Sequence, residues 1–280
     1  MIKKKIKLII LILLTFLDKI YVFKKLFLLI INIKNNDFKT IEKKNFKIKF
    51  YVPNELCEFR VNTFYSKEPE TLDWIDSFKD DTIFWDIGAN IGLYSCYAAL
   101  KKKIKIIAFE PSVFNLEILA KNIFLNNCVE KINIVSLPLG ENNNFNKFRM
   151  SNTFQGGALS SFDKNIDWKG DKIDSIFEYT ILGSSIDDLL KNFKLEYPDY
   201  IKIDVDGLEH IILKNAKNVL KNAKEILIEV NDSFNDQALN VKKILDESGF
   251  KMIKKLHSEY IDNNDEGFAK TYNQIWIKDN

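Results

Sequence analysis

The stretch FWDIGANIGLYS, residues 84–95, decides the fold of this chain of 280 residues. An apolar run carries a single acid, Asp86, and is followed by two glycines, Gly88 and Gly92, and a second apolar run. A glycine-containing turn between a strand and a helix usually lets the backbone approach a nucleotide-like ligand. The dinucleotide pattern is G-x-G-x-x-G, whereas this turn reads D-x-G-x-x-x-G. The added acid and the missing glycine therefore indicate a different ligand.

Strand-like and helix-like runs alternate from residue 82 onward. We expect strands at 82–87, 105–110, 131–137, 199–205, 225–230, 250–256 and 273–279, and helices at 92–103, 111–127, 184–193, 208–220 and 236–249. Such alternation predicts an α/β fold with a doubly wound, mostly parallel, Rossmann-like sheet of seven strands. No helix pattern separates the last two strands, which predicts an antiparallel pair at one edge. Residues 140–184 are polar, with only short strand-like pieces.

The chain divides by pattern into three units, residues 1–35, 36–80 and 81–280. Residues 36–80 are a lead-in of strands and a helix. Within the lead-in, 44–53 alternates like a strand and 58–65 is its expected hairpin partner, while 66–78 begins with polar and proline signals typical of a helix start. Residues 81–280 hold the main domain.

Residues 1–35 are basic and strongly apolar. They contain eight lysines and one aspartate, a charge of +7, which leaves −5 for the remainder of a chain whose total is +2. The longest run without charge, 8–17, is about half the length that spans a bilayer. No small-residue cleavage site for a signal peptide follows it. The pattern predicts a basic amphipathic helix, and residues 1–33 either contact an anionic membrane surface or dock on protein.

The body of the chain is mildly acidic, which argues against nucleic acid as the main partner because phosphate contacts need clustered Lys and Arg. The three cysteines, Cys57, Cys96 and Cys128, are widely spaced and form no C-x-x-C motif. We interpret them as buried free thiols of a cytoplasmic protein, at the inner face of the membrane if the N-terminal segment binds there.

Acids follow most of the predicted parallel strands. In such sheets ligands bind beyond the carboxyl ends of the strands, at the point where the strand order reverses. These ends carry Asp86, Glu110, Asp204 with Asp206, and Glu229 with Asn231 and Asp232. A row of carboxylates at one sheet edge predicts a site for a polar, partly cationic ligand.

Glu110 and Asp86 together favour a particular cofactor. Glu110 follows Asp86 by 24 residues, close to the spacing at which an acid accepts hydrogen bonds from ribose hydroxyls. Asp86 points to the place where a dinucleotide would put its pyrophosphate, and a carboxylate there disfavours phosphate and favours a cation. S-adenosylmethionine has no phosphate and carries a sulfonium and an ammonium. The pattern therefore predicts this cofactor over NAD.

The motifs DIGANIGLYS, AFEPSVFNLEILAKNIFLNN, SSIDDLL and DYIKIDVDGLEHIIL together resemble the FkbM-type methyltransferase family over about residues 50–232. The resemblance implies the class I S-adenosylmethionine-dependent fold and O-methylation of sugars or of hydroxyls in natural products. Two positions depart from the family pattern: Asp206 stands where Glu is more frequent, and Ser185 stands where Thr is common.

The resemblance also implies roles for individual residues. The cofactor site would be lined by Asp86, Gly88, Ala89, Asn90, Gly92 and Glu110. A second motif beside the transferred methyl group would comprise Asp204, Asp206, Gly207 and Glu209. We expect Asp204 to contact the reaction centre and Asp206 or Glu209 to act as general base or to anchor the acceptor, because a hydroxyl must lose its proton during methyl transfer.

A magnesium-dependent variant of this chemistry is the alternative. Asp204, Asn231 and Asp232 would supply the oxygen ligands that magnesium prefers. The Asn-Asp dipeptide is common in turns, so we interpret Asn231 and Asp232 as part of a turn and not as metal ligands.

The sequence therefore predicts an S-adenosylmethionine-dependent methyltransferase that O-methylates a hydroxyl of a saccharide. This small-molecule or glycan acceptor is lipid-linked if the N-terminal segment binds membrane. A non-catalytic module that binds S-adenosylmethionine and an NAD-binding oxidoreductase are the rival hypotheses. The sequence leaves the acceptor and the oligomeric state open.

Overall fold

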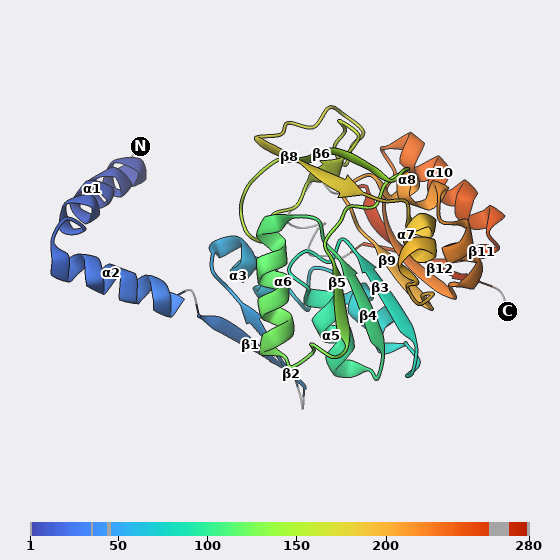
Figure 1. Ribbon diagram of the computed structural model, residues 1–280, viewed down its shortest axis with the longest axis horizontal. Coiled ribbons are helices and arrows are strands. Elements are labelled where there is room, and N and C mark those ends of the chain that lie inside the picture. The colour runs from blue at the N-terminus through green and yellow to red at the C-terminus, as the bar shows by residue number, and fades with distance from the viewer. Residues whose placement is uncertain (1, 35, 44–45, 258–268, 279–280) are drawn as a thin grey trace.

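The computed structural model describes residues 2–34, 36–43, 46–257 and 269–278 (Figure 1). Its centre is a seven-stranded sheet with the order β11-β12-β10-β9-β3-β4-β5. These strands are β3 (Ile83–Ile87), β4 (Lys105–Phe109), β5 (Ile132–Val135), β9 (Tyr200–Ile203), β10 (Glu225–Asn231), β11 (Phe250–Leu256) and β12 (Thr271–Lys278).

The sheet has the predicted topology. The pairs β10–β9, β9–β3, β3–β4 and β4–β5 are all parallel, and β12 lies antiparallel between β10 and β11. The prediction of a seven-stranded, mostly parallel sheet with antiparallel strands at one edge is confirmed. The chain runs from β3 outward to β5 and then returns to β9 on the other side of β3, so the strand order reverses between β3 and β9.

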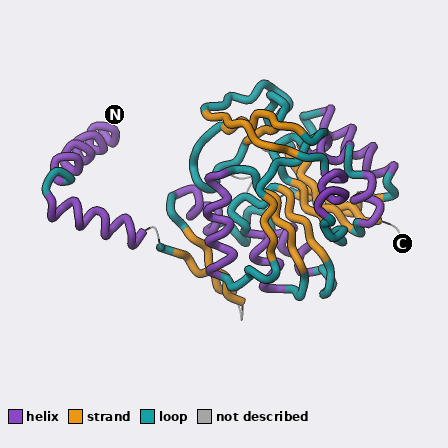
Figure 2. The backbone as a smooth tube through the Cα atoms, in the orientation of Figure 1, coloured by secondary structure: helices purple, strands orange, loops and turns teal. Residues whose placement is uncertain are grey.

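Helices cover both faces of the sheet (Figure 2). One core lies between the sheet and α4 (Pro69–Asp76), α5 (Leu93–Lys101) and α6 (Val113–Leu125). The other lies under α7 (Ile186–Phe193), α8 (Glu209–Lys214), α9 (Lys217–Asn222) and α10 (Asn235–Glu247). Side chains alternate along each strand, so Phe84 and Tyr200 enter the first core, whereas Trp85 and Ile201 enter the second.

The lead-in differs from its predicted form in one element. β2 (Phe46–Tyr51) pairs antiparallel with β1 (Phe38–Lys43), and residues 44–45 lie outside the described residues. The prediction of a strand at 58–65 is wrong, because α3 (Glu55–Asn62) occupies most of it. The Asn54 side chain caps this helix by accepting a hydrogen bond from the Cys57 N–H at 2.8 Å. This cap and two glutamates in the first turn favour a helix over the strand propensity of the segment.

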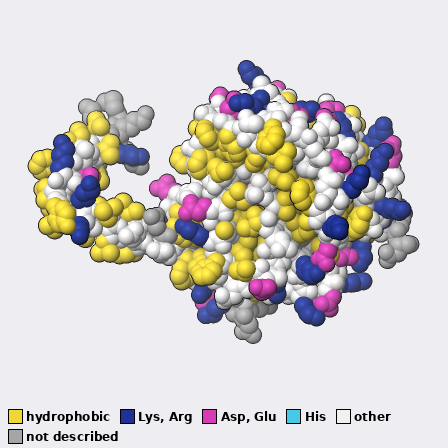
Figure 3. Space-filling view, in the orientation of Figure 1, with side chains coloured by type: hydrophobic (Ala, Val, Ile, Leu, Met, Phe, Trp, Pro, Cys, Tyr) yellow, Lys and Arg dark blue, Asp and Glu magenta, His cyan; other side chains and the backbone are white. Residues whose placement is uncertain are grey.

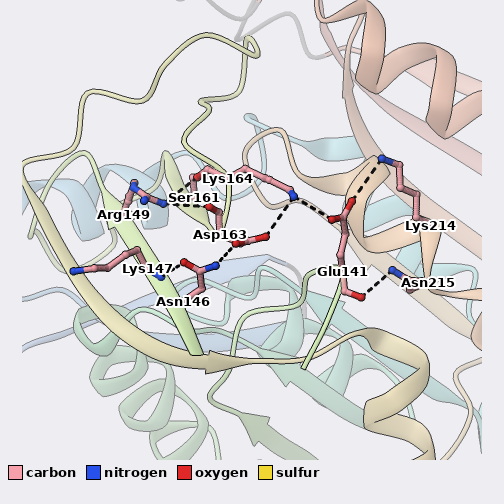
Figure 4. Close-up of polar contacts among 9 residues, drawn as sticks. All are labelled: Glu141, Asn146, Lys147, Arg149, Ser161, Asp163, Lys164, Lys214 and Asn215. Carbon is pink, nitrogen blue, oxygen red and sulfur yellow. Dashed lines mark hydrogen bonds and ion pairs between the residues drawn. The ribbon is translucent and has the colours of Figure 1, made fainter. Parts of the chain in front are cut away.

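Residues 140–184 form a small second sheet with the order β7-β6-β8. Its strands are β6 (Asn144–Met150), β7 (Ser160–Phe162) and β8 (Phe177–Gly183). Figure 4 shows the polar contacts that fix it to the main domain. Lys164 binds Glu141 at 3.0 Å, and the Glu141 backbone oxygen accepts a hydrogen bond from Asn215, which follows α8, at 3.0 Å. These contacts hold the small sheet above the carboxyl ends of the main strands.

The N-terminal residues form two helices instead of one, α1 (Ile2–Leu17) and α2 (Tyr21–Lys34), which project from the body as an arm (Figure 1). The helix breaks at residues 18–20, where Lys19 and Ile20 make tighter bonds to the third residue before each. Apolar side chains of the arm are exposed, with lysines among them (Figure 3). Among the described residues, no helix has both the length and the apolarity needed to cross a bilayer.

Candidate active site

The glycine turn after β3 passes directly against the end of β9. Gly88 has a φ of +86°, and a Cβ built on it would lie 1.9 Å from the backbone oxygen of Asp204. Only glycine fits this position, because any other residue is strained at such a φ and its Cβ would overlap the Asp204 backbone. The N–H groups of Gly88 and Ala89 donate to the Phe109 oxygen at 3.0 and 2.9 Å. The turn is therefore fixed where the strand order reverses.

A cavity of about 300 Å³ opens at this turn. Its volume is at the lower end of the range typical of small-molecule sites. Five of the predicted site residues line it, namely Gly88, Ala89, Asn90, Asp204 and Asp206. Its polar lining also includes Arg60, Thr63, Lys67, Glu68, Tyr94, Lys202, Glu229 and Thr271. Asp86, Gly92, Glu110 and Glu209 are not part of the wall.

Asp86 lies behind the cavity wall. It is buried, and one carboxylate oxygen accepts a hydrogen bond from the Ser95 hydroxyl at 2.5 Å. The other oxygen, Oδ1, has no hydrogen-bond partner among the described residues. Burial raises the pKa of Asp86, and the nearby Lys202 ammonium partly offsets this. Asp86 therefore adds negative charge beneath the turn, and its contact with a cofactor stays a prediction.

Glu110 holds the backbone of the glycine turn. Its carboxylate accepts hydrogen bonds from the N–H groups of Asn90 at 2.8 Å and Ser112 at 2.7 Å. Burial raises the pKa of Glu110 to about 7, although these two bonds favour the ionised form. The acid predicted to bind ribose thus orders the turn itself, and its predicted role toward ribose is untested.

Residues 155–160, which we call the strap, cross the site beside Asn90. The Gly157 oxygen accepts hydrogen bonds from the side chains of Asn90 at 2.8 Å and Asn115 at 3.0 Å. Asp206 accepts hydrogen bonds from the N–H groups of Leu159 at 2.7 Å and Ser160 at 3.3 Å. Burial raises the pKa of Asp206 to about 6. Asp206 therefore lines the cavity and also fixes the strap to the end of β9.

Glu209 is committed to the backbone. It is fully buried, and one oxygen accepts hydrogen bonds from the N–H groups of Val205 at 2.9 Å and Gly207 at 3.3 Å. The other oxygen accepts a hydrogen bond from the Gln237 side chain. This arrangement orders the turn after β9, so the structure does not favour Glu209 as the general base.

Glu209 should also shape the pH dependence of stability. Burial raises the pKa of its carboxyl to about 7, above the unfolded value near 4.5. The folded state then binds a proton more tightly, so this group makes the free energy of unfolding fall as pH rises from about 4.5 to about 7. We expect Glu209→Gln to flatten that part of the stability profile in urea unfolding at pH 5 and 7.5. Glu117→Gln, at an exposed acid, is the control, and an unchanged slope in Glu209→Gln would contradict this role.

Sequence reasoning missed a group of charged residues around Lys202. Lys202 is 1% exposed, and its ammonium lies 2.6 Å from the Asp204 carboxylate and over the Tyr94 ring. Burial by itself would lower the pKa of Lys202, but Asp204, Glu68 and Asp86 raise it above its usual value. A charged residue inside the apolar strand YIKI was the available signal. We term Lys202 with Glu68, Asp86, Asp204 and Glu229 the charge cluster.

Two of the residues named for the magnesium alternative have other partners in the structure. The Asn231 side chain donates to the Trp168 oxygen and accepts from the Ser233 N–H, and Asp232 forms an ion pair with Lys255. Within the described ranges, no group of three or more His, Cys, Asp or Glu side chains is arranged to hold a metal ion.

The reversed strand order, the glycine turn and the acid-lined cavity define a protein of the class I methyltransferase type. The profile of the methyltransferase FkbM domain matches residues 86–252, more than half of the chain. The chain belongs to the FkbM methyltransferase family, and the resemblance seen in its motifs is confirmed.

Individual relatives are more distant. The hexuronic acid methyltransferase AglP of Haloferax volcanii is 26% identical over 175 residues, which cover 62% of this chain and 65% of that protein. The chain thus matches just under two thirds of the length of this curated relative. The crystal structure of the methyltransferase FkbM from Methylobacillus flagellatus has a TM-score of 0.48 and 17% identity, covering 71% of this chain and 44% of that one.

Proposed function

We propose that this protein transfers a methyl group from S-adenosylmethionine to a hydroxyl oxygen of a saccharide. The observation that carries the proposal is the cavity at the reversal of strand order, where the Gly88 turn packs against the Asp204 backbone and Asp204 and Glu229 line the wall. The relative that is a hexuronic acid methyltransferase supports a sugar as the acceptor class. The saccharide acceptor is either a free sugar or a unit of a glycan.

The residues present fit this cofactor. Three carboxylates of the charge cluster, Glu68, Asp204 and Glu229, line the cavity beside three basic side chains, and they would pair with the sulfonium and ammonium of the cofactor. The backbone of the Gly88–Asn90 turn would contact the cofactor, and Asp204 would lie near the positively charged groups of the cofactor. When bound, S-adenosylmethionine supplies an electrophilic methyl group, and the protein must position the acceptor and exclude water.

Titration calorimetry with S-adenosylmethionine, S-adenosylhomocysteine and NAD tests the cofactor. We expect the first two to bind and NAD not to bind. Incubation of labelled S-adenosylmethionine with a cell-envelope glycan extract then tests the reaction, and label should appear in the glycan. Binding of NAD alone would support an oxidoreductase, and cofactor binding without any transfer would support a non-catalytic module.

Asp204→Asn should reduce turnover by about 10²-fold or more, since it removes a charge at the cavity floor that is 25% exposed and faces the ligand space. The fold should persist, because Asn keeps the shape of the side chain and can still accept a hydrogen bond from Lys202. Methyl transfer is measured with the glycan extract and folding by circular dichroism. Asp171→Asn is the control, since Asp171 is exposed and does not line the cavity. Unchanged turnover in Asp204→Asn would exclude Asp204 from the reaction.

We also propose that the α1–α2 arm, residues 2–34, lies on an anionic membrane surface. Its large apolar side chains are exposed from Ile6 to Ile33, an area that soluble proteins rarely leave uncovered. The lysines among them match the charge of acidic lipid headgroups. A membrane position would bring the cavity close to lipid-linked glycans.

Vesicle flotation tests the arm with the full-length protein. We expect binding to phosphatidylcholine vesicles that contain phosphatidylglycerol, and weaker binding without it. Substituting four exposed apolar residues by Gln should weaken binding by about 1,000-fold or more, because each loses about 1–2 kcal/mol of apolar burial. These residues are Leu11, Ile12, Leu28 and Leu29. The matched control places Gln at exposed apolar positions of the body, Phe124, Val129, Phe145 and Leu239. Dimerisation through the arm without any binding to vesicles would refute the proposal.

A further inference from the structure

The cavity floor carries a row of groups from three adjacent parallel strands. The register pairs Ile87 of β3 with Ile203 of β9, and Ile203 with Ile228 of β10. The next position on each strand brings Gly88, Asp204 and Glu229 side by side at the carboxyl edge, and all three line the cavity. Glu229 is therefore the immediate neighbour of Asp204 on the side away from the glycine turn.

The other carboxylates near the cavity are already engaged. Asp206 binds two N–H groups of the strap, and Asp204 is paired with Lys202. Burial would raise the pKa of Glu68, but Lys67 and Lys202 outweigh it and lower that pKa to about 2. A cation or an N–H donor bonded to a carboxylate makes it a weaker base than the same carboxylate without that partner.

Glu229 differs from these acids. Among the described residues its carboxylate takes part in no hydrogen bond or ion pair, although it faces the cavity. The charged groups that act on it are Asp204, which directly follows β9, Glu68 and Lys67 from the lead-in, and Glu209 from α8. Burial, followed by the charges of Asp204 and Glu68, raises the pKa of Glu229 well above its ordinary value. Among the described residues, Glu229 is thus the carboxylate of the cavity wall with no bonded cation or N–H donor.

We infer that Glu229 is the proton acceptor of the methyl transfer. The inference rests on the proposed function. As the O–CH₃ bond forms and the S–CH₃ bond breaks, the bonding pair stays on sulfur and the hydroxyl proton passes to the Glu229 carboxylate. The products are a methyl ether, a neutral thioether and a protonated Glu229, so atoms and charge balance. Asp204, held by Lys202, is then a fixed charge beside the reaction and does not take the proton.

Glu229 has to be ionised for this role. The positive charge of S-adenosylmethionine favours the ionised carboxylate, whereas S-adenosylhomocysteine has a neutral sulfur and is otherwise matched. Cofactor binding should therefore displace a proton from Glu229, and more so for S-adenosylmethionine. Proton release is obtained from calorimetric titrations near pH 7 in buffers of different ionisation enthalpy.

We expect the wild-type protein to release more protons on binding S-adenosylmethionine than on binding S-adenosylhomocysteine, and Glu229→Gln to lose this difference while affinity changes by less than about tenfold. Glu70→Gln is the matched control, because Glu70 is another buried acid of raised pKa that is bonded to Asn273 and lies outside the cavity wall. It should keep the difference. Equal release for the two ligands in the wild type, a difference that survives in Glu229→Gln, or its loss in Glu70→Gln would each overturn the inference. Failure of the wild type to bind S-adenosylmethionine would instead remove the proposed function, and the inference with it.

Turnover provides the second readout. With the glycan extract, Glu229→Gln should lower kcat by about 10²-fold or more with little change in the KM for S-adenosylmethionine, and Glu229→Asp should retain part of the activity. Turnover of Glu229→Gln within threefold of the wild type would refute the assignment. A loss of cofactor affinity that accounts for the whole effect would also refute it, since Glu229 would then be a binding residue.

Discussion

Gly88→Ala should destabilise the protein by about 3 kcal/mol or more. The φ of +86° costs a non-glycine residue about 1–2 kcal/mol, and the new Cβ would meet the Asp204 backbone oxygen at 1.9 Å. Relief requires the turn and the end of β9 to separate, and overpacking of this kind typically costs about 1–3 kcal/mol. For a chain of this size the melting temperature should fall by about 6–12 °C. Cofactor binding should be lost with it, because these two backbone segments form the cavity floor.

Gly249→Ala separates the two causes. Gly249 has a similar φ of +82°, but the atom that a Cβ would meet there, Cε of Lys278, is 3.8 Å away. This variant should therefore show the conformational cost alone, about 1–2 kcal/mol. Urea and thermal unfolding of both variants provide the comparison. Equal losses would mean that the contact between Gly88 and Asp204 contributes nothing beyond backbone strain.

Lys202→Met should destabilise the protein by about 3–5 kcal/mol, which is the typical cost of removing one partner of a buried ion pair. Met fills a similar volume, so packing changes little. The loss leaves Asp204 and Asp86 without the cation that offsets their burial, and the remaining carboxylates of the charge cluster repel one another. The variant should recover part of its stability at pH 5, because protonation relieves this repulsion.

The comparison for Lys202→Met is Lys105→Met. Lys105 forms an ion pair with Glu196 of almost the same length, 2.7 Å, but both side chains are more than half exposed. Its loss should cost at most about 1 kcal/mol. The double variant Lys202→Met with Asp204→Asn should lose less than the two single variants together, since both remove the same interaction. Additive losses would show that Lys202 acts independently of Asp204.

Much of the fold was predictable because its signals are local. The apolar strands, the helices between them and the glycine turn at Gly88 each depend on a few adjacent residues, and the order of elements limits the topology. The segment 58–65 was mispredicted because the helix cap at Asn54 outweighed its β-like composition. The bend at residues 18–20 also went unpredicted, as the amphipathic pattern continues across it.

The candidate site was predictable only in part. The sequence identified the strand ends, and five of its residues line the cavity, but it left Asp206 and Glu209 as equal candidates for the general base. The difference between them depends on donors far along the chain, such as Gln237 for Glu209 and the strap for Asp206. Lys202 was overlooked because the apolar pattern of its strand predicts only that the strand is buried, and it does not indicate a partner for a single charged residue.

The sequence by itself determined the family, the glycine turn and the edge of the sheet at which ligands bind, because these depend on the order of elements along the chain and on short motifs of adjacent residues. Only the tertiary structure decided which acids face the ligand. Glu110 and Glu209 bind the protein's own backbone, whereas Glu229 faces the cavity beside Asp204. The physical reason is that a carboxylate's role depends on the donors and charges around it, and these are brought together by the register of parallel strands and by the strap.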